Sequence, residues 1–315
     1  MKNILIVGLG NIGLRHLEGI LKINKKIHIF IIDKQKKKIK LLKQIKNKKI
    51  YFFNNINSIK NLKFKLVIFA TNSKPRFFLL NKLLKNNIVK NIIFEKVVFQ
   101  SSSQFKFALE IIKKKKINAW VNCTRRCMKF YKYLKNMLKN EGGIYMKFVS
   151  SKWEMGSNLI HYIDLFDFLI NKKTKFKYEN KLLKKIFLSK REGYHEFFGK
   201  IKILNNDNVL IVQNFIKNIK PSLSIISKNI NIYIDLKKNK KNVKIKKNNI
   251  LKYINFKHEL VSNLAKKNVE KILQNKKIDL TTLNETWSHH RLIFKLFNQH
   301  LEKITKKKYK KCPIS

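Results

Sequence analysis

A glycine turn within the first thirty-three residues constrains the fold more than any other part of the chain. The apolar residues 4–7 lead directly into the turn, and a helical pattern of apolar residues follows it. A second apolar run then ends at Asp33. This order of strand, glycine turn, helix, strand and acidic residue is typical of a dinucleotide-binding unit. The turn itself reads Gly8, Leu9, Gly10, Asn11, Ile12, Gly13.

The glycines and the acidic residue each have a mechanical role in such a unit. Gly8 permits a tight turn, Gly10 lets the backbone approach a pyrophosphate, and Gly13 lets the helix pack closely on the strand. The helix N-terminus presents N–H groups and a positive dipole end to the phosphates. Asp33 lies twenty residues beyond Gly13, where a carboxylate can accept both ribose hydroxyls and repels a 2′-phosphate. We therefore predict NAD rather than NADP; the alternative is a glycine-rich turn in another α/β fold.

The rest of the chain changes its pattern near Gly142 and Gly143. Before them, apolar strands alternate with helical segments, which indicates a doubly wound parallel sheet of the Rossmann type within an α/β protein. After them, strands alternate apolar and polar residues, which indicates an α+β domain with a large, mainly antiparallel sheet. We predict domains at residues 1–122 and 123–315. Strands are expected at 3–7, 27–32, 50–53, 66–70, 91–94, 119–122, 145–151, 197–204, 209–215, 223–227, 230–236 and 243–246, and helices at 34–46, 75–85, 104–114, 158–170, 257–274 and 283–304.

The charge of the chain is extreme, with 72 Lys and Arg against 18 Asp and Glu. Only six of these cations are Arg, and the Lys residues are spread along the whole chain among Asn and Ile. Because Lys, Asn and Ile share A/T-rich codons, a biased genome explains this composition, and we expect no specific nucleic-acid partner. General attraction to polyanions stays the alternative. The three cysteines match neither a disulfide framework nor a metal site, and no apolar run reaches membrane length, so a cytoplasmic protein is expected.

Two segments carry side chains suited to proton transfer. Lys96 follows a strand end, where ligands bind in open α/β sheets, although a surface Lys is the alternative. His161 and Asp164 are three residues apart on a predicted helix, so they share a face, and Asn158 lies one turn earlier. A His beside a carboxylate can accept the proton of an alcohol, and the alternative is a packed His with polar neighbours.

Taken in order, these motifs resemble the Gfo/Idh/MocA oxidoreductases, the family of glucose–fructose oxidoreductase and inositol dehydrogenase. The resemblance spans essentially the whole chain and rests on the glycine turn with Arg15 and His16, the strand end at residues 70–72, the Glu95–Lys96 pair and the helix with His161. It implies that Lys96, His161 and Asp164 are catalytic. A terminal helix with Leu280, Leu283 and Glu285 would return to the first domain. Cofactor contacts are implied for Gly8, Gly10, Asn11, Ile12, Gly13, Asp33, Thr71, Asn72 and Glu95.

The implied activity is hydride transfer between NAD and a secondary alcohol of a sugar or nucleotide sugar. Homo-oligomers are expected because the amphipathic sheet of the second domain leaves a face that can pair subunits. Arg125 and Arg126 resemble a segment of members encoded with surface-polysaccharide genes and suit an anionic substrate, with solvated arginines as the alternative. Asn158 is a further substrate contact. Two departures from the family pattern are Val97 in place of Pro and Ser157 in place of an acidic residue. They keep open a non-catalytic protein of the same fold that binds NAD or a sugar.

Overall fold

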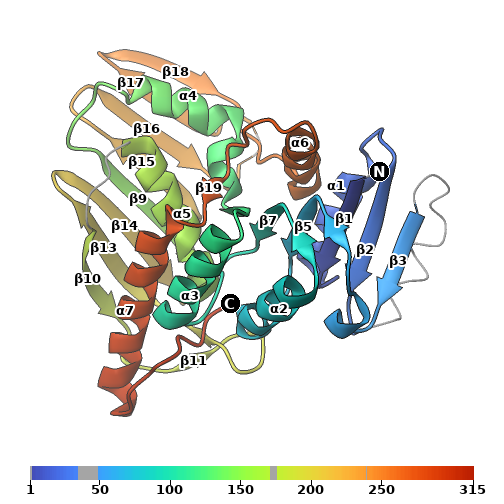
Figure 1. Cartoon of the computed structure of the whole chain (residues 1–315). Coiled ribbons are helices and arrows are strands. Elements are labelled where there is room, and N and C mark those ends of the chain that lie inside the picture. Colours follow the sequence, from blue (N-terminus) through green and yellow to red (C-terminus); the bar gives the residue numbers. More distant parts are fainter. Residues whose placement is uncertain (1, 35–48, 171–175, 239) are drawn as a thin grey trace. The chain divides into compact units, whose positions relative to one another are not determined.

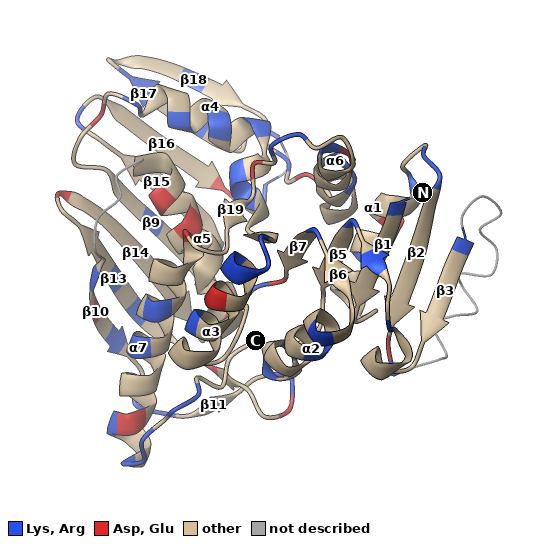
Figure 2. Cartoon of the chain, in the orientation of Figure 1, with Lys and Arg blue, Asp and Glu red and all other residues tan. Residues whose placement is uncertain are grey.

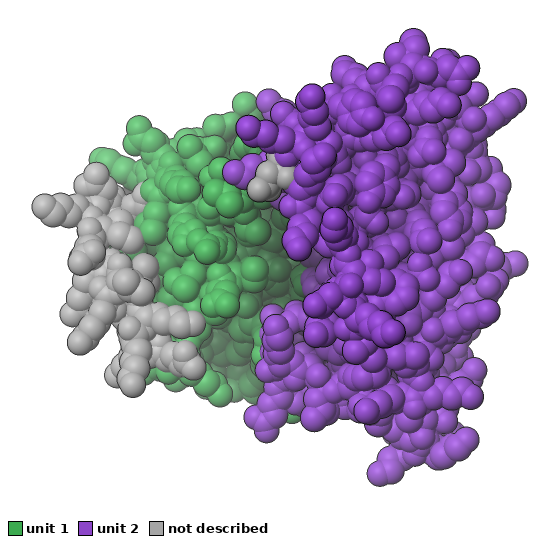
Figure 3. Space-filling model, turned by 180° about the vertical axis from the view of Figure 1, so that it is seen from behind, with its two compact units in different colours: residues 1–124, 259–285 green, residues 125–258, 286–315 purple. Residues whose placement is uncertain are grey.

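The computed structural model describes residues 2–34, 49–170, 176–238 and 240–315. Most of the helix predicted at 34–46 therefore lies outside the described residues. The chain forms two compact units, shown in Figure 3: residues 1–124 with 259–285, and residues 125–258 with 286–315. Each unit has its own sheet and its own core, and each is described by itself.

Unit 1 is built on a seven-stranded sheet with the order β19-β8-β7-β5-β1-β2-β3 (Figure 1). All neighbouring strands are parallel except β19, which runs antiparallel to β8. The central strands are continuous apolar runs that are buried on both faces, as expected for a parallel sheet covered by helices. The strands are β1 (Lys2–Val7), β2 (Ile27–Ile32), β3 (Lys49–Phe53), β5 (Leu66–Phe69), β7 (Asn91–Phe94), β8 (Asn118–Val121) and β19 (Thr281–Thr282).

Helices cover both faces of this sheet because the strand order reverses at β1. The crossover through α1 (Asn11–Leu21) leads to β2 on one side of β1, whereas those through α2 (Ser73–Asn86) and α3 (Ser102–Lys114) lead the other way. Right-handed crossovers then place α1 on one face and α2 and α3 on the other. Helix α6 (Val261–Leu273) packs on α1, where a Cβ at Gly19 would lie 2.4 Å from the carbonyl oxygen of Ser262. Smaller elements are η2 (Ile56–Ser58), β4 (Lys63–Phe64) and β6 (Ile88–Val89).

Unit 2 contains an eight-stranded sheet with the order β10-β13-β14-β9-β15-β16-β17-β18. Only β9 and β14 run parallel, so the sheet is mainly antiparallel, as predicted. Buried and partly exposed residues alternate along β9 and β13, which gives the sheet one apolar face. The strands are β9 (Tyr145–Ser151), β10 (Lys177–Leu182), β13 (Gly199–Asn205), β14 (Asn208–Phe215), β15 (Ser222–Ile226), β16 (Ile230–Asp235), β17 (Val243–Lys247) and β18 (Ile250–Ile254), beside the pair β11 (Phe187–Leu188) and β12 (His195–Glu196).

The apolar face of this sheet packs against helices. Phe148 of β9 stacks on Tyr162 of α5 (Met155–Ile170) with ring centroids 3.8 Å apart. Helices α4 (Lys129–Met137) and α7 (Thr286–Thr305) pack beside α5. The short helix η3 (Thr124–Cys127) precedes α4. Among the helices of the described residues, none is both long enough and apolar enough to cross a membrane.

The structure differs from the sequence prediction at residues 280–285. They form the short strand β19 and a turn rather than part of a helix, because β8 has an open edge that residues 281–283 complete. Leu283 donates its backbone N–H to the carbonyl of Ala119 at 2.9 Å, and α7 begins only at Thr286. The edge strands β10 and β18 were also not predicted, because apolar and polar residues do not alternate regularly in their sequences, KYENKL and ILKYI.

Candidate functional site

At two positions of the glycine turn in unit 1, Gly8 and Gly13, only glycine accommodates the backbone. Gly8 has φ of +96° and donates its N–H to the carbonyl of Ile32 at 2.8 Å. A Cβ at Gly13 would lie 2.1 Å from the carbonyl oxygen of Gly8. The turn therefore brings α1 as close to β1 as the backbone allows, as its spacing predicts.

The N-terminus of α1 is open toward solvent. Gly10 is its N-cap and forms no side-chain capping bond, and a Cβ at Gly10 would meet no atom within 4 Å. Asn11 and Ile12, in the first turn, are exposed. Backbone N–H groups and a positive dipole end are thus available to an anion that approaches this turn.

A cavity of about 680 Å³ lies in front of the turn. Asp33 is in its wall, and one of its carboxylate oxygens accepts the N–H of Leu9 at 2.5 Å. Five predicted cofactor residues share this wall, namely Gly8, Gly10, Asp33, Thr71 and Asn72. The other walls come from β2, the residues around η2 and the first two turns of α2, including Ile32, Lys34, Asn54, Asn55, Ile56, Asn57, Pro75, Phe78, Leu79 and Lys82.

Glu95 is not in the wall of that cavity but at the centre of a buried polar cluster at the strand ends of the same sheet. One of its oxygens lies 2.8 Å from Nε2 of His16 and 2.5 Å from Nδ2 of Asn122. Burial opposes ionisation of Glu95, but the hydrogen bond and charge of His16, the bond from Asn122 and the charge of Lys96 outweigh it and lower its pKa. Since the carboxylate accepts, His16 donates from Nε2. Sequence reasoning assigned no role to His16 or Asn122, although both belong to motifs it used.

The lowered pKa of Glu95 predicts acid-sensitive folding. The unfolded chain binds a proton at Glu95 more readily than the folded chain, so this stabilisation is complete above the ordinary value of 4.5 and is lost as pH falls further. Glu95→Gln is expected to lower the free energy of unfolding by about 1–3 kcal/mol at neutral pH and to flatten its decline below about pH 5. Urea unfolding at a series of pH values measures both effects. Glu18→Gln, at an exposed carboxylate, is the control, and equal acid slopes for Glu95→Gln and wild type would contradict the assignment.

Arg76 holds the segment that carries Lys96. Its side chain is 1% exposed, and Nη1 lies 2.5, 2.6 and 2.9 Å from the carbonyl oxygens of Glu95, Val97 and Val98. Nη2 donates to the carbonyl of Thr71. The peptide bond between Lys96 and Val97 is cis, and Lys96 itself is half-buried. One guanidinium thus ties the strand end of β5 to that of β7. One signal in the sequence pointed to this role of Arg76, which is that the chain contains few arginines.

Unit 2 places the other predicted catalytic residues on α5. His161 is half-buried, whereas Asp164 is fully buried and accepts Arg126 on both oxygens, at 2.7 and 3.0 Å. Burial raises the pKa of Asp164, and Arg126 and His289 act against that rise. The carboxylate therefore fixes Arg126 in a bidentate pair.

The remaining predicted substrate residues lie around the start of the same helix. Asn158 donates to the carbonyl of Trp153 at 3.0 Å, and Ser157 donates to that of Glu154 at 3.1 Å. The guanidinium of Arg125 lies over the ring of Tyr162, 4.5 Å from its centroid. Arg125 and Arg126 are thus adjacent in sequence but anchored by different groups, one by a ring and one by a carboxylate.

The histidines of α7 are core residues. His289 and His290 are fully buried; His289 pairs with Asp167 at 3.3 Å, and His290 contacts the carbonyl of Thr286 at 2.9 Å. Within the described part of the chain, no three His, Cys, Asp or Glu side chains are grouped so that they could hold a metal ion.

Comparison with known proteins relates the first part of the chain to a family of oxidoreductases and the fold of nearly the whole chain to solved structures. Residues 2–123 match the Gfo/Idh/MocA oxidoreductase family, described as having an NAD-binding Rossmann fold. No curated protein matches the chain in sequence. Among solved structures, a dehydrogenase from Clostridium difficile is 17% identical, with a TM-score of 0.69 over 95% of this chain and 99% of that one. At these identities the structural likeness shows the fold alone.

Two further structures differ from each other in their stated roles. UDP-N-acetylglucosamine 3-dehydrogenase from Acidithiobacillus ferrooxidans is 10% identical, with a TM-score of 0.70 over 94% of this chain and 96% of that one. A super-repressor mutant of Gal80p from Saccharomyces cerevisiae is 12% identical, with a TM-score of 0.73 over 96% of each chain. The same fold therefore occurs in a dehydrogenase and in a protein described as a repressor.

Proposed function

Because residues 2–123 belong to the Gfo/Idh/MocA family of oxidoreductases with an NAD-binding Rossmann fold, we propose that this chain is an NAD-dependent dehydrogenase of a sugar or nucleotide sugar. The observation that carries the proposal is the open N-terminus of α1 beside a cavity whose wall contains Asp33. The helix N-terminus can bind the pyrophosphate of the cofactor, and the carboxylate of Asp33 can accept hydrogen bonds from its ribose. Lys96 follows the end of β7, which is separated from β1 by β5 in the same sheet.

The cavity residues fit a dinucleotide. Gly10 leaves room for its phosphates, Gly8 permits the tight turn, Asp33 accepts its ribose hydroxyls, and Thr71 and Asn72 border the same space. Asn11, Ile12 and Gly13 contribute the first turn of α1, and Glu95 holds its strand end through the buried cluster. Bound NAD supplies the hydride acceptor or donor.

The proposed chemistry of the chain itself is proton transfer at the substrate hydroxyl. Lys96 donates a hydrogen bond to that oxygen and polarises it, and His161 accepts or returns its proton. Asp164 acts through Arg126, since both of its oxygens accept the guanidinium. Arg76 and Glu95 position the segment from which Lys96 projects.

The proposed substrate is anionic. Asn158 lies near the start of α5. The two arginines of η3, Arg125 and Arg126, contact α5 through Tyr162 and Asp164, and arginines suit phosphate oxygens. A nucleotide sugar combines an alcohol with such phosphates, which fits a role in surface-polysaccharide or other sugar metabolism. The similar structure of a UDP-N-acetylglucosamine 3-dehydrogenase supports this class of substrate. The three free cysteines fit a reducing compartment, so we place the protein in the cytoplasm.

Turnover with a panel of nucleotide sugars tests the proposal. The protein is mixed with NAD and each sugar, and the absorbance of reduced nicotinamide is followed. Reduction of NAD by at least one sugar is expected. A second candidate is a binding protein without turnover, favoured by Ser157 in place of an acidic residue and by the Gal80p structures. That candidate predicts binding of NAD and sugar with no reduction across the panel.

Cofactor choice is expected to depend on the charge of Asp33. Asp33→Asn keeps an oxygen for the N–H of Leu9 but removes the repulsion of a 2′-phosphate. Wild type is expected to bind NAD at least about tenfold more tightly than NADP, and the variant to narrow that preference to about threefold or less. Calorimetric titration with both cofactors measures the ratio. An unchanged ratio in Asp33→Asn would contradict the proposed role.

We also infer a second copy of the chain on the outer face of the sheet in unit 2. Phe148 faces α5, so the residues beside it in β9 face the other way, as do their partners in register across β15, β16, β17 and β18. This outer face carries large exposed apolar side chains, which indicate an interface between subunits. Sedimentation equilibrium of the wild-type chain tests it, with an oligomer expected. The exposed members are Ile226, Tyr233, Leu251 and Tyr253.

A further inference from the structure

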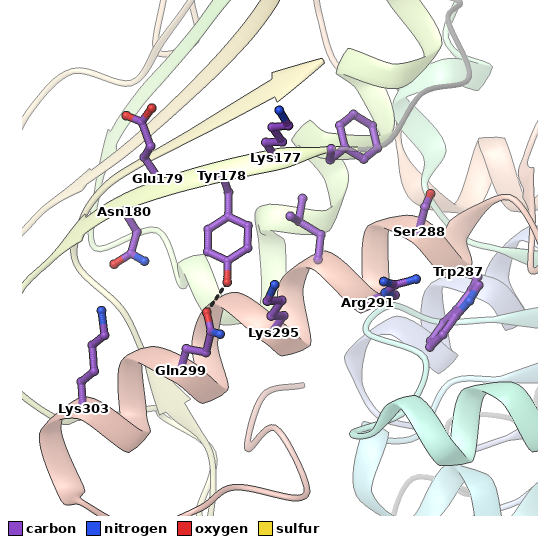
Figure 4. A pocket seen from close by; sticks show the side chains of 12 residues that line it. Lys177, Tyr178, Glu179, Asn180, Trp287, Ser288, Arg291, Lys295, Gln299 and Lys303 are labelled. Atoms are coloured by element: carbon purple, nitrogen blue, oxygen red, sulfur yellow. Dashed lines mark hydrogen bonds between the residues drawn. The ribbon is translucent and has the colours of Figure 1, made fainter. Parts of the chain in front are cut away.

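A second cavity lies entirely within unit 2, between the edge strand β10 and the helix α7 (Figure 4). Its volume is about 780 Å³. Tyr178 of β10 donates to the side-chain oxygen of Gln299 of α7, so the two walls are joined directly. We call this cavity the α7 groove. It is lined by Phe176, Lys177, Tyr178, Glu179, Asn180, Trp287, Ser288, Arg291, Leu292, Lys295, Gln299 and Lys303.

One face of α7 supplies most of the polar lining. Trp287, Arg291, Lys295, Gln299 and Lys303 follow one another at intervals of four residues and therefore lie along one stripe of the helix. Successive members are about 6 Å apart along the axis, at 1.5 Å per residue. Figure 4 shows Trp287 and Arg291 side by side at one end of the groove and Lys303 at the other.

The α7 groove has an excess of positive charge. Its lining contains Lys177, Arg291, Lys295 and Lys303 but only one carboxylate, Glu179, which pairs with Lys202 at 3.6 Å. Among the described residues, none of these four cations forms an ion pair within 4.0 Å. The remaining residues, 35–48, 171–175 and 239, include neither Asp nor Glu. The charge of the groove is therefore not neutralised within the chain.

Lys and Arg occur in many elements of both units (Figure 2), and nearly all of them are Lys, so the arginine is more informative than the lysines. Each of the other five arginines has a partner in the fold: Glu18 for Arg15, backbone carbonyls for Arg76, the ring of Tyr162 for Arg125, Asp164 for Arg126 and the carbonyl of Ser315 for Arg191. Arg291 is exposed, and its guanidinium has no such partner among the residues that the structure describes. A planar guanidinium binds phosphate oxygens in a bidentate way that Lys cannot reproduce.

We propose that the α7 groove binds a nucleoside diphosphate. The ring of the base lies against Trp287, and the phosphates lie along Arg291 and Lys295. Trp287 and Arg291 are one helical turn apart, a distance similar to that between a base and its first phosphate. Lys295 lies one turn further along and is placed to contact the second phosphate. This site does not depend on the proposed dehydrogenase activity, because none of its residues belongs to that machinery.

Calorimetric titration with UDP tests the proposal. The whole chain is saturated with NAD beforehand, so that UDP does not report on the cofactor cavity. UDP is expected to bind, inorganic pyrophosphate to bind at least about tenfold more weakly, and uridine more weakly still. Equal affinity for UDP and pyrophosphate would overturn the role of Trp287 and with it the proposal.

Variants locate the bound UDP. Arg291→Gln and Trp287→Phe are each expected to lower the affinity for UDP about tenfold. Lys308→Gln, which removes an equal charge just beyond α7, is expected to change that affinity less than twofold. Arg125→Gln separates this site from the proposed substrate site. If UDP binding is lost in Arg125→Gln but kept in Arg291→Gln, the nucleotide binds at the proposed substrate site, and the proposal that the α7 groove binds it is overturned. Binding kept in Arg125→Gln supports the groove whether or not the chain is a dehydrogenase.

Discussion

Arg76→Met is expected to lower the free energy of unfolding by about 3 kcal/mol or more. The substitution keeps an apolar stem but removes a buried guanidinium, so the carbonyls of Thr71, Glu95, Val97 and Val98 lose their donor. Each buried acceptor without a partner carries a desolvation penalty. Because a typical domain is stable by only about 5–15 kcal/mol, urea unfolding followed by circular dichroism will show the change clearly.

Two further variants separate this effect from loss of charge. Arg15→Met removes an exposed guanidinium that pairs with Glu18, and it is expected to change stability by less than about 0.5 kcal/mol. Arg76→Lys keeps the charge but cannot span the four carbonyls, so an intermediate loss is expected. If Arg76→Met unfolds at the same urea concentration as Arg15→Met, Arg76 does not hold the segment.

Lys96→Met and His161→Gln are each expected to lower turnover by about a hundredfold or more. Both remove a group that the proposal places at the substrate hydroxyl, so the loss falls on the chemical step. Affinity for NAD is expected to stay within about threefold, because neither residue lines the cofactor cavity. Steady-state rates with the sugar that wild type oxidises, together with NAD titrations, measure the two effects separately.

Residues of the same type elsewhere provide the controls. Lys113→Met, near the end of α3, and His28→Gln, in β2, are expected to retain wild-type turnover. Full activity in His161→Gln would show that the proton is moved by another group, and full activity in Lys96→Met would show that Lys96 does not polarise the substrate oxygen. Equal losses in the variants and their controls would point to folding instead.

Most of the fold could be predicted from the sequence. The first sheet was predicted because its strands are continuous apolar runs bounded by helices, and β2 and β7 have the expected bounds. The second sheet was predicted from alternation, which β9 shows without interruption. Residues 2–123 match the predicted family, and the change from a parallel to a mainly antiparallel sheet is confirmed by the strand pairing.

The parts that could not be predicted depend on contacts between distant segments. Residues 259–285 join unit 1 because α6 packs on α1 and β19 completes the edge of β8. No local pattern encodes such a return. The family resemblance implied it for the segment with Leu280, Leu283 and Glu285, whereas the patterns of the sequence placed a single boundary between residues 122 and 123. The short strand β19 consists of two Thr residues, so it has no apolar pattern that could mark it in the sequence.

The candidate site shows the same division. Gly8, Gly10 and Asp33 follow from spacing, because one βαβ unit fixes them locally. The partners of Glu95 and the role of Arg76 do not, since His16, Asn122 and Arg76 are brought to β7 from three other segments. The pairing of Asp164 with Arg126 likewise joins α5 to η3, 38 residues apart in the chain. Helical spacing suggested His161 as the neighbour of Asp164 and gave no sign of Arg126.

Calorimetric titration of the folded chain with NAD and with NADH tests the central claim most directly. Binding of one cofactor per chain is expected, and Gly13→Ala is expected to abolish it, because the added Cβ would clash with the carbonyl oxygen of Gly8 and displace the start of α1. The absence of heat with both cofactors, on wild-type protein whose circular dichroism and cooperative unfolding show that it is folded, would contradict the account.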